Sequence, residues 1–188
     1  MSEQKRTALS DQIMEEYPSL EGFLHDLHTD LTSGSWDLVS YSFQTGFEKM
    51  WDVVKADQTD ILVRPLLSLW RQSIELTVKS SILLLEGEFK GKAGHNLLVL
   101  FEQLKESAND KGLNVDNEIT RKVSALFKNA QSVDPWADRF RYPTDKKGNK
   151  HVGIKVDLDE LFQAHWMMVT WCEGVVVELR EEFGIGLP

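Results

Sequence analysis

The sequence predicts an all-α protein, a helical bundle in one main domain, and three observations carry this prediction. Apolar residues recur at intervals of three and four along most of the chain, which is the spacing of one helix face. Patterns that alternate residue by residue, as strands require, are scarce. Turn signals rich in Gly, Ser, Asn and Asp separate the periodic stretches, so most stretches have a recognisable start and stop.

The composition favours an ordered globular fold. The chain has 188 residues, of which 41% are hydrophobic and 27% charged, and it contains six Trp and nine Phe. A chain of this length can bury a substantial core, and aromatic side chains contribute large buried areas. We therefore expect one packed domain with room for a helical extension.

Capping residues and prolines mark the ends of the expected helices. Pro18 interrupts the first helical stretch, Ser35 is a candidate N-cap for the second, Gly87 ends the third and Asp157 caps the last. Pro65 falls in the first turns of the third helix, where proline is tolerated. The expected helical stretches are residues 11–31, 36–56, 59–86, 95–108, 115–130 and 158 to near the C-terminal end.

The segment of residues 132–151 is the least regular part of the chain. It carries two prolines and a Lys-Lys-Gly-Asn turn around Gly148. We expect an irregular loop here, with a short hairpin as an alternative in which residues 140–142 pair with residues 152–156.

Charge and cysteine content narrow the function classes. The formal net charge is −9, from 21 Lys and Arg against 30 Asp and Glu, which argues against coating long stretches of nucleic acid. A nucleotide or a single RNA strand in a local basic pocket remains compatible with this charge. Cys172 is the single cysteine, so no intramolecular disulfide can form and we expect a buried thiol. No signal peptide and no membrane-length apolar run is present, which predicts a cytoplasmic protein without a membrane partner.

Arg71, Glu75 and Lys79 form the first candidate constellation. They are spaced at i, i+4 and i+8 on the third helix, within ion-pairing reach of each other. One interpretation is a solvated helix face with two surface salt bridges, which contribute little. The other is a face that closes over a ligand or a partner subunit.

His95 is the second candidate, in the segment of residues 94–98 (GHNLL) that opens the fourth helix. A histidine at a helix N-terminus can contact an anionic ligand, because the backbone N–H groups there favour negative charge. The alternative is a packing or capping role.

The third candidate is a basic loop at residues 139–150. Its cations are interleaved with aromatic side chains, the combination that binds single-stranded nucleic acid by stacking and phosphate contact. The alternative is a solvated turn whose aromatics pack into the core. The residues concerned, with His151 just beyond them, are Trp136, Arg139, Phe140, Arg141, Tyr142, Lys146, Lys147 and Lys150.

No motif for a metal or a cofactor is found. His25 and His28 are separated by one helical turn, but without further ligands a hydrated helix face is the better interpretation. The sequence has no phosphate-binding glycine loop, no CxxC, no HExxH and no nucleophile elbow. We therefore expect no cofactor and no metal.

Several of these segments occur together in the HEPN family of helical domains, and the chain resembles that family over about residues 59–183. Residues 69–79 (LWRQSIELTVK) are similar to the family's first motif helix, and residues 94–100 (GHNLLVL) to the opening of the next. Residues 134–135 (DP), 140–143 (FRYP) and 157–161 (DLDEL) resemble a bacterial branch. The resemblance implies an antiparallel bundle at residues 58–188, with residues 1–57 as an N-terminal helical extension.

The resemblance also implies functions. Many family members are metal-independent ribonucleases of toxin or defence type that act as homodimers, with an Arg and a His around the scissile phosphate. Here Arg141 and His151 would take those roles, although nine residues separate them, and His95 is the alternative base. The residues implied to bind RNA or a nucleotide are Arg71, Glu75, Lys79, Arg139, Tyr142, Lys146 and Lys147. The alternative is a non-catalytic, dimeric interaction module that binds a partner protein.

Overall fold

The computed structural model describes residues 11–12, 15–16, 34–57, 59–89 and 94–183. The chain divides into two compact units, Met1–Gly34 and Ser35–Pro188. In the first unit, residues 11–12 and 15–16 are helical. The rest of the predicted first helix, with His25 and His28, lies outside the described residues.

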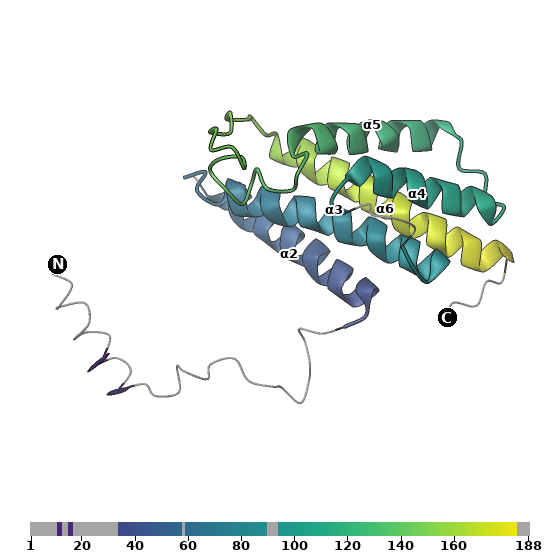
Figure 1. Cartoon of the computed structure of the whole chain (residues 1–188), viewed down its shortest axis with the longest axis horizontal. Helices are drawn as coiled ribbons and strands as arrows, with labels where there is room; N and C mark the ends of the chain where they lie inside the picture. Colours follow the sequence, from purple (N-terminus) through teal and green to yellow (C-terminus); the bar gives the residue numbers. More distant parts are fainter. Residues whose placement is uncertain (1–10, 13–14, 17–33, 58, 90–93, 184–188) are drawn as a thin grey trace. The chain divides into compact units, whose positions relative to one another are not determined.

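The second unit is a helical bundle (Figure 1), which confirms the all-α prediction. No strand occurs among the residues that the structure describes, and no helix there is long and apolar enough to cross a membrane. The helices are α2 (Trp36–Ala56), α3 (Val63–Glu86), α4 (Leu97–Asp110), α5 (Glu118–Val133) and α6 (Leu158–Phe183).

Local chemistry fixes most helix ends. The Asn96 side chain accepts hydrogen bonds from two backbone N–H groups at the start of α4, and the side chains of Asn117 and Asp157 cap α5 and α6 in the same way. Gly87 follows α3 in the left-handed conformation (φ 76°), and its N–H donates to the Leu83 carbonyl at 2.8 Å. The predicted stop at Gly87 is therefore confirmed.

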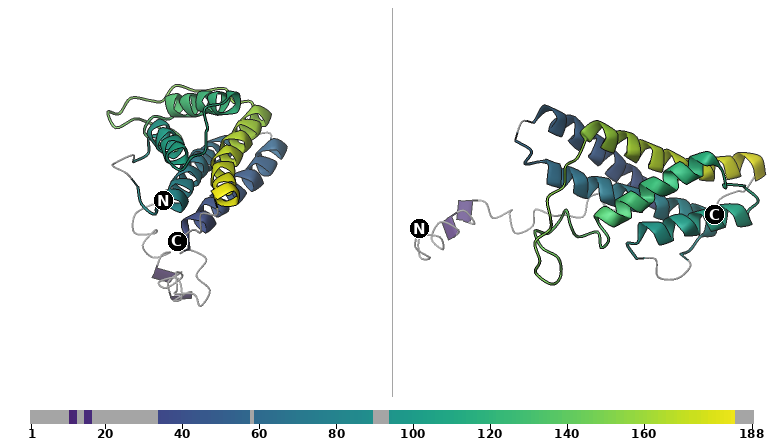
Figure 2. Two further views of the ribbon diagram at one scale, coloured as in Figure 1. Left: turned by 90° about the vertical axis from the view of Figure 1, so that its right-hand side faces the viewer. Right: turned by 90° about the horizontal axis from the view of Figure 1, so that it is seen from above.

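The helices do not all alternate in direction. Figures 1 and 2 show that α2 and α5 run opposite to α3, α4 and α6. The parallel pair α3–α4 is also evident from Lys111, just past the end of α4, whose Nζ lies 4.0 Å from Glu86 Oε1 at the end of α3. A parallel pair requires the chain to return along α3, so the link after Gly87 brings the start of α4 back to the middle of α3, where His95 lies beside Glu75.

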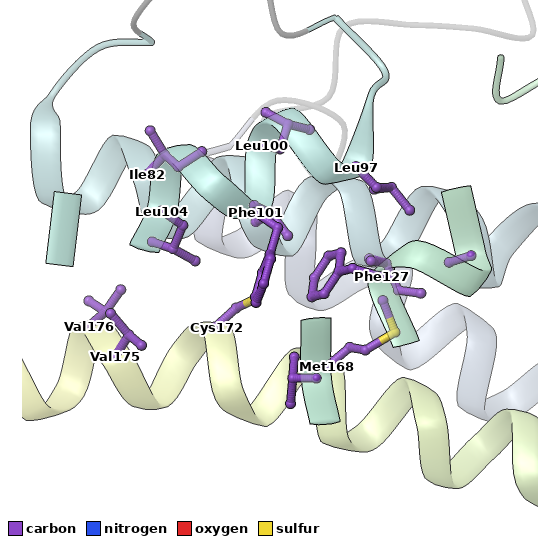
Figure 3. Packing of buried hydrophobic residues seen from close by; sticks show 14 of the residues in the cluster. Ile82, Leu97, Leu100, Phe101, Leu104, Phe127, Met168, Cys172, Val175 and Val176 are labelled. Carbon is purple, nitrogen blue, oxygen red and sulfur yellow. The ribbon is translucent and has the colours of Figure 1, made fainter. Parts of the chain in front are cut away.

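Helix α3 is the central element of the bundle, in contact with α2, α4 and α6. It is buried around most of its circumference, including the polar residues Ser73, Glu75 and Thr77. Figure 3 shows the core beside it, where Phe101 of α4 and Phe127 of α5 stack with ring centroids 4.4 Å apart. Cys172 is buried in the same core, as predicted, and burial raises the pKa of its thiol.

Helix α2 packs as part of the bundle. Its Trp51 indole donates to the Leu158 carbonyl at 2.7 Å, and Lys55 pairs with Asp159 at 2.7 Å, both at the start of α6. The boundary between compact units lies after Gly34. By packing, α2 therefore belongs with residues 59–183, whereas the resemblance assigned it to a separate extension of residues 1–57.

The segment between α5 and α6 lies at the end of the bundle where α3 begins (Figure 1). Its only ladder contact among the described residues is an isolated antiparallel bridge between Thr144 and Lys150, around a turn in which Gly148 has φ 84°. The Asp145 carboxylate holds this turn by accepting from the Lys147 and Asn149 N–H groups. Residues 140–142 and 152–156 form no strands, so the hairpin alternative holds only as this single bridge.

Two glycines should respond to alanine in opposite directions. Gly87→Ala places a side chain in the left-handed region and is expected to cost about 1 kcal/mol. Gly174 lies within α6, and a Cβ added there would meet only open space, so Gly174→Ala should stabilise by about 0.5–1 kcal/mol. Urea unfolding of both variants checks the pair; equal shifts of the same sign would contradict the assigned helix end.

Candidate active site

A buried ionic cluster centred on Glu75 is the most concentrated polar feature of α3. The Glu75 side chain is 1% exposed and accepts three charged or ionisable donors. Arg71 Nη1 lies 3.1 Å from Oε2, and Lys79 Nζ and His95 Nδ1 each lie 2.8 Å from Oε1. Three of these residues come from successive turns of α3 and the fourth from the start of the α4 segment. We call Arg71, Glu75, Lys79 and His95 the Glu75 cluster.

The return of the chain along α3 positions His95. Gly94 precedes it with φ 56°, a conformation suited to glycine, and Asn96 follows it as the N-cap of α4. Arg71 Nη2 donates to the His95 carbonyl at 2.5 Å, so the same guanidinium holds both Glu75 and the backbone of His95. The imidazole is therefore fixed on one side, while 60% of its side chain is exposed.

The protonation of the cluster follows from its contacts. Burial alone would raise the pKa of the Glu75 carboxyl, but the Lys79 hydrogen bond and the charges of Lys79 and Arg71 outweigh it, and the pKa lies below its ordinary value. Glu75 is therefore ionised near neutral pH and can only accept, so His95 Nδ1 carries the proton it donates. In this tautomer the Nε2 atom is the ring nitrogen that can accept a proton.

The irregular segment of residues 132–151 adds the charges of Asp134 and Arg141 to the site. Burial lowers the pKa of the Arg71 guanidinium, the Glu75 and Asp134 charges oppose this, and the nearby Arg141 charge reinforces it. Asp134 is 1% exposed and accepts from the Asp138 and Arg139 N–H groups, which ties it to the loop. With these two residues the site holds three permanent cations against two carboxylates, a net positive charge within an acidic protein.

The burial of the Glu75 cluster distinguishes between the two interpretations of Arg71, Glu75 and Lys79 that the sequence left open. Arg71 and Glu75 are 3% and 1% exposed, so a solvated face with two surface salt bridges is the wrong interpretation. Buried ion pairs are costly to desolvate and need several partners, and this carboxylate has three. The role of Arg71, Glu75 and Lys79 in binding a ligand stays a prediction.

The basic loop divides between packing and exposure. Phe140 is buried, whereas Trp136 and Tyr142 are 69% and 55% exposed. Lys146 lies over the Trp136 ring and Arg141 over the Tyr142 ring, at 5.8 and 5.7 Å from the ring centroids. Lys147 and Lys150 are also exposed. The loop therefore presents two exposed aromatics and four exposed cations, and only one of its aromatics is in the core.

Arg139 and Arg141 brace the loop backbone. Arg139 donates to the carbonyls of Val133 and Val152, at 3.1 and 2.5 Å. Arg141 donates through Nε and Nη2 to the carbonyl of Ala137, whose φ of 56° is unfavourable for a residue with a side chain. The strained turn therefore sits between Asp134 and Arg141, next to Arg71.

Among the described residues, no hydrogen bond or ion pair joins His151 to the Glu75 cluster. His151 lines a groove between the start of α3 and residues 151–158, and Arg141 is not part of that lining. Within the described part of the chain, no hydrogen bond or ring contact joins His151 to Arg141, and the His151 Nε2 is buried without a partner. His95, the alternative base in the sequence analysis, is the histidine that lies with the cations.

The sequence analysis missed the contribution of Asp134 to the site. The available signal was an Asp just after a helix and before Pro135, the pattern of a side chain that accepts from the following N–H groups. No group of three or more His, Cys, Asp or Glu side chains suited to a metal occurs among the residues described.

The comparisons with known proteins give no family. No protein-family model matches the chain, and no curated protein and no solved structure shows significant similarity to it.

Proposed function

We propose that this chain is a HEPN-like, RNA- or nucleotide-interacting protein that cleaves RNA without a metal, with His95 as the general base. The observation that carries the proposal is the Glu75–His95 pair set among cations. A carboxylate that orients a half-exposed imidazole, with its second nitrogen free to accept, is the arrangement that general base catalysis requires. The local positive charge suits a phosphodiester, although the whole chain is acidic.

The proposed chemistry uses the substrate's own nucleophile. His95 Nε2 takes the proton of a ribose 2′-hydroxyl, and the 2′-oxygen attacks the adjacent phosphorus. The bond from phosphorus to the 5′-oxygen breaks, and that oxygen leaves with a proton from solvent, which gives a 2′,3′-cyclic phosphate and a 5′-hydroxyl. Arg141, which is exposed, neutralises the developing phosphate charge, while the buried Arg71 holds Glu75 and His95 in place.

The test is RNA cleavage in the presence of a chelator. The wild-type protein should convert single-stranded RNA into fragments ending in 2′,3′-cyclic phosphate, and His95→Gln should reduce the rate about a hundredfold. Arg141→Ala should reduce it about as strongly. The matched control is Lys122→Ala, which removes an exposed cation paired with Glu118 on the surface of α5. Undiminished cleavage by His95→Gln, or no cleavage by the wild type, would refute the ribonuclease proposal.

Homodimer formation in the cytoplasm, in a toxin or defence system, is part of the same proposal. Exposed Trp166 and Val177 lie on one face of α6, with Thr170 and Gly174 between them. Such a face supports association with a second copy.

The second candidate function is a non-catalytic module that binds a partner protein through the same face. The mass in solution, measured with and without Trp166→Glu, tests association. A dimer lost in that variant, in a protein that neither binds nor cleaves RNA, would favour the second candidate.

A further inference from the structure

A groove of about 600 Å³ runs between the first turns of α3 and the segment before α6. Its apolar lining includes Val63, Leu67 and Phe140. Its polar lining consists of Asp60, Arg64, Arg139, His151 and Lys155. The volume lies within the range of small-molecule sites, and an apolar lining with a few polar groups is their usual character. We call it the α3–loop groove.

The groove and the Glu75 cluster share one face of α3. Arg64 and Arg71 are two helical turns apart, so they lie on the same side of the helix at a separation of about 10 Å along the axis. The irregular segment contacts both places, because Arg64 Nη1 donates to the Tyr142 carbonyl and Arg71 is within electrostatic reach of Arg141. Glu75, which holds His95, is one further turn along and about 16 Å from Arg64 along the axis, so a short RNA strand can span the two places.

The wall of the groove offers unused hydrogen-bonding groups. Gly153, Ile154, Lys155 and Val156 line it, and their backbone groups make no hydrogen bond to any other described residue. The buried Nε2 of His151 also has no partner, which leaves a polar atom whose desolvation costs about 1–3 kcal/mol. A ligand with several donors and acceptors along one edge would satisfy these groups.

Two guanidinium groups that line the groove are held in place. Arg139 is fixed by the Val133 and Val152 carbonyls, and Arg64 by the Tyr142 carbonyl. Planar guanidinium groups stack on the faces of unpaired bases, and base edges are recognised by hydrogen bonds. The chemistry of the groove thus matches both the face and the edge of a nucleobase.

A neighbouring groove of about 630 Å³ is a poorer match. It shares Leu67, Phe140 and residues 154–156 but is lined by Asp157, Asp159 and Glu160, with Trp70 and Met168 in its apolar wall. Three carboxylates against one cation, Lys155, repel a phosphodiester chain, whereas the α3–loop groove sets Asp60 against Arg64, Arg139 and Lys155. The charges therefore favour the α3–loop groove.

We propose that the α3–loop groove is a nucleobase subsite, which seats a base next along the strand from the ribose whose 2′-hydroxyl is activated by His95. The inference rests on the proposed function for the identity of that ribose. Base selectivity then arises from residues 153–156 and His151, because a base whose edge does not match leaves these groups unpaired. In this assignment His151 reads the base and moves no proton.

The test measures binding of the four ribonucleoside 3′-monophosphates, without any turnover. The best and worst of them should differ at least about tenfold in Kd, and inorganic phosphate should bind more weakly than either. Gly153→Leu fills the groove from a position with open space around its Cβ and should weaken the best ligand about tenfold. The control Ala125→Leu adds a side chain of the same size on the exposed surface of α5, away from the groove lining, and should leave the Kd unchanged.

A second measurement keeps the subsite testable if Gly153→Leu does not fold. In the unmodified protein, the backbone amide resonances of residues 152–156 should shift when the best 3′-monophosphate is added. Equal Kd values for all four nucleotides, or shifts confined to the Glu75 cluster, would overturn the subsite.

The nucleobase subsite and the ribonuclease activity can be refuted independently of each other. Selective nucleotide binding in the groove without RNA cleavage would leave the subsite standing and refute the ribonuclease. Cleavage whose base preference is the same in folded Gly153→Leu would refute the subsite and leave the ribonuclease standing.

Discussion

Glu75→Ala is expected to lower the free energy of unfolding by about 3–5 kcal/mol, the cost of breaking a buried ion pair by removing one partner. The Arg71 side chain is 3% exposed and would lose its carboxylate while remaining out of water. Arg71 Nε already lacks a hydrogen-bond partner in the buried cluster, so little compensation is available. Lys79 is 17% exposed and can extend toward solvent, so the loss is concentrated on Arg71. Urea unfolding followed by circular dichroism at neutral pH measures the effect.

Two matched variants show whether burial of the ion pair causes the loss of stability expected in Glu75→Ala. Glu118→Ala breaks an i,i+4 pair with Lys122 whose side chains are 72% and 65% exposed, and it should cost only about 0.3–0.5 kcal/mol. The double variant Arg71→Met/Glu75→Leu removes both buried charges and should recover most of the loss, because no unpaired guanidinium remains. A loss below about 1 kcal/mol in Glu75→Ala, or no recovery in the double variant, would contradict a buried, mutually dependent cluster.

The second large expected effect is a fall in the free energy of unfolding at acidic pH, caused by His165. This side chain of α6 is 3% exposed, its Nε2 lies 2.9 Å from the Ser73 hydroxyl, and its ring lies 4.2 Å from the Phe47 ring. Burial lowers the pKa of His165 to about 4 from an ordinary 6.5, because the charged imidazolium is poorly solvated there. The folded state therefore prefers the neutral ring.

The sign and the pH window follow from that depressed pKa. Above pH 6.5 the ring is neutral in both the folded and the unfolded chain, and the full stability is present. As the pH falls from 6.5 toward 4, the unfolded chain takes up the proton first, so stability falls by up to about 3 kcal/mol at 1.36 kcal/mol per pKa unit.

The difference in unfolding free energy between the wild type and His165→Gln separates the contribution of His165 from that of the carboxyl groups, which also titrate in acid. Glutamine keeps a group that can bond Ser73 but does not titrate, so its stability should fall less steeply between pH 6.5 and pH 4. Unfolding free energies measured at several pH values give the two curves. Parallel curves would show that His165 does not carry the acid sensitivity.

Much of the fold could be predicted from local signals. The α2 helix has the predicted bounds, and Gly87 and Asp157 end and cap their helices as predicted. Ser35 stands at the predicted N-cap position but its side chain makes no capping hydrogen bond, and the cap at Asn96 was not predicted. Predicted starts were less accurate: α3 begins at Val63, four residues after the predicted start, and α5 at Glu118, three residues late. Caps and apolar periodicity are properties of neighbouring residues, so the sequence alone contains them.

The sequence predicted which residues form the candidate site better than it predicted how they are arranged in space. Arg71, Glu75 and Lys79 were grouped correctly, because their spacing places them on one helix face whatever the fold. Their burial was not predictable, because it depends on α3 lying at the centre of the bundle. The pairing of Arg141 with His151 was inferred from a resemblance, and the structure instead places His95 with the cations.

The sequence by itself determined where most helices start and stop, which faces are apolar and which segment is irregular and basic, since each depends on residues within a few positions of one another. Only the tertiary structure decided that α3 and α4 run parallel and that α3 is enclosed on several sides. Those two facts bring His95 onto Glu75 and turn a surface-like stripe of charges into a buried cluster. The physical reason is that burial and long-range pairing arise from the packing of all the helices together, and no local pattern encodes the path by which the chain returns.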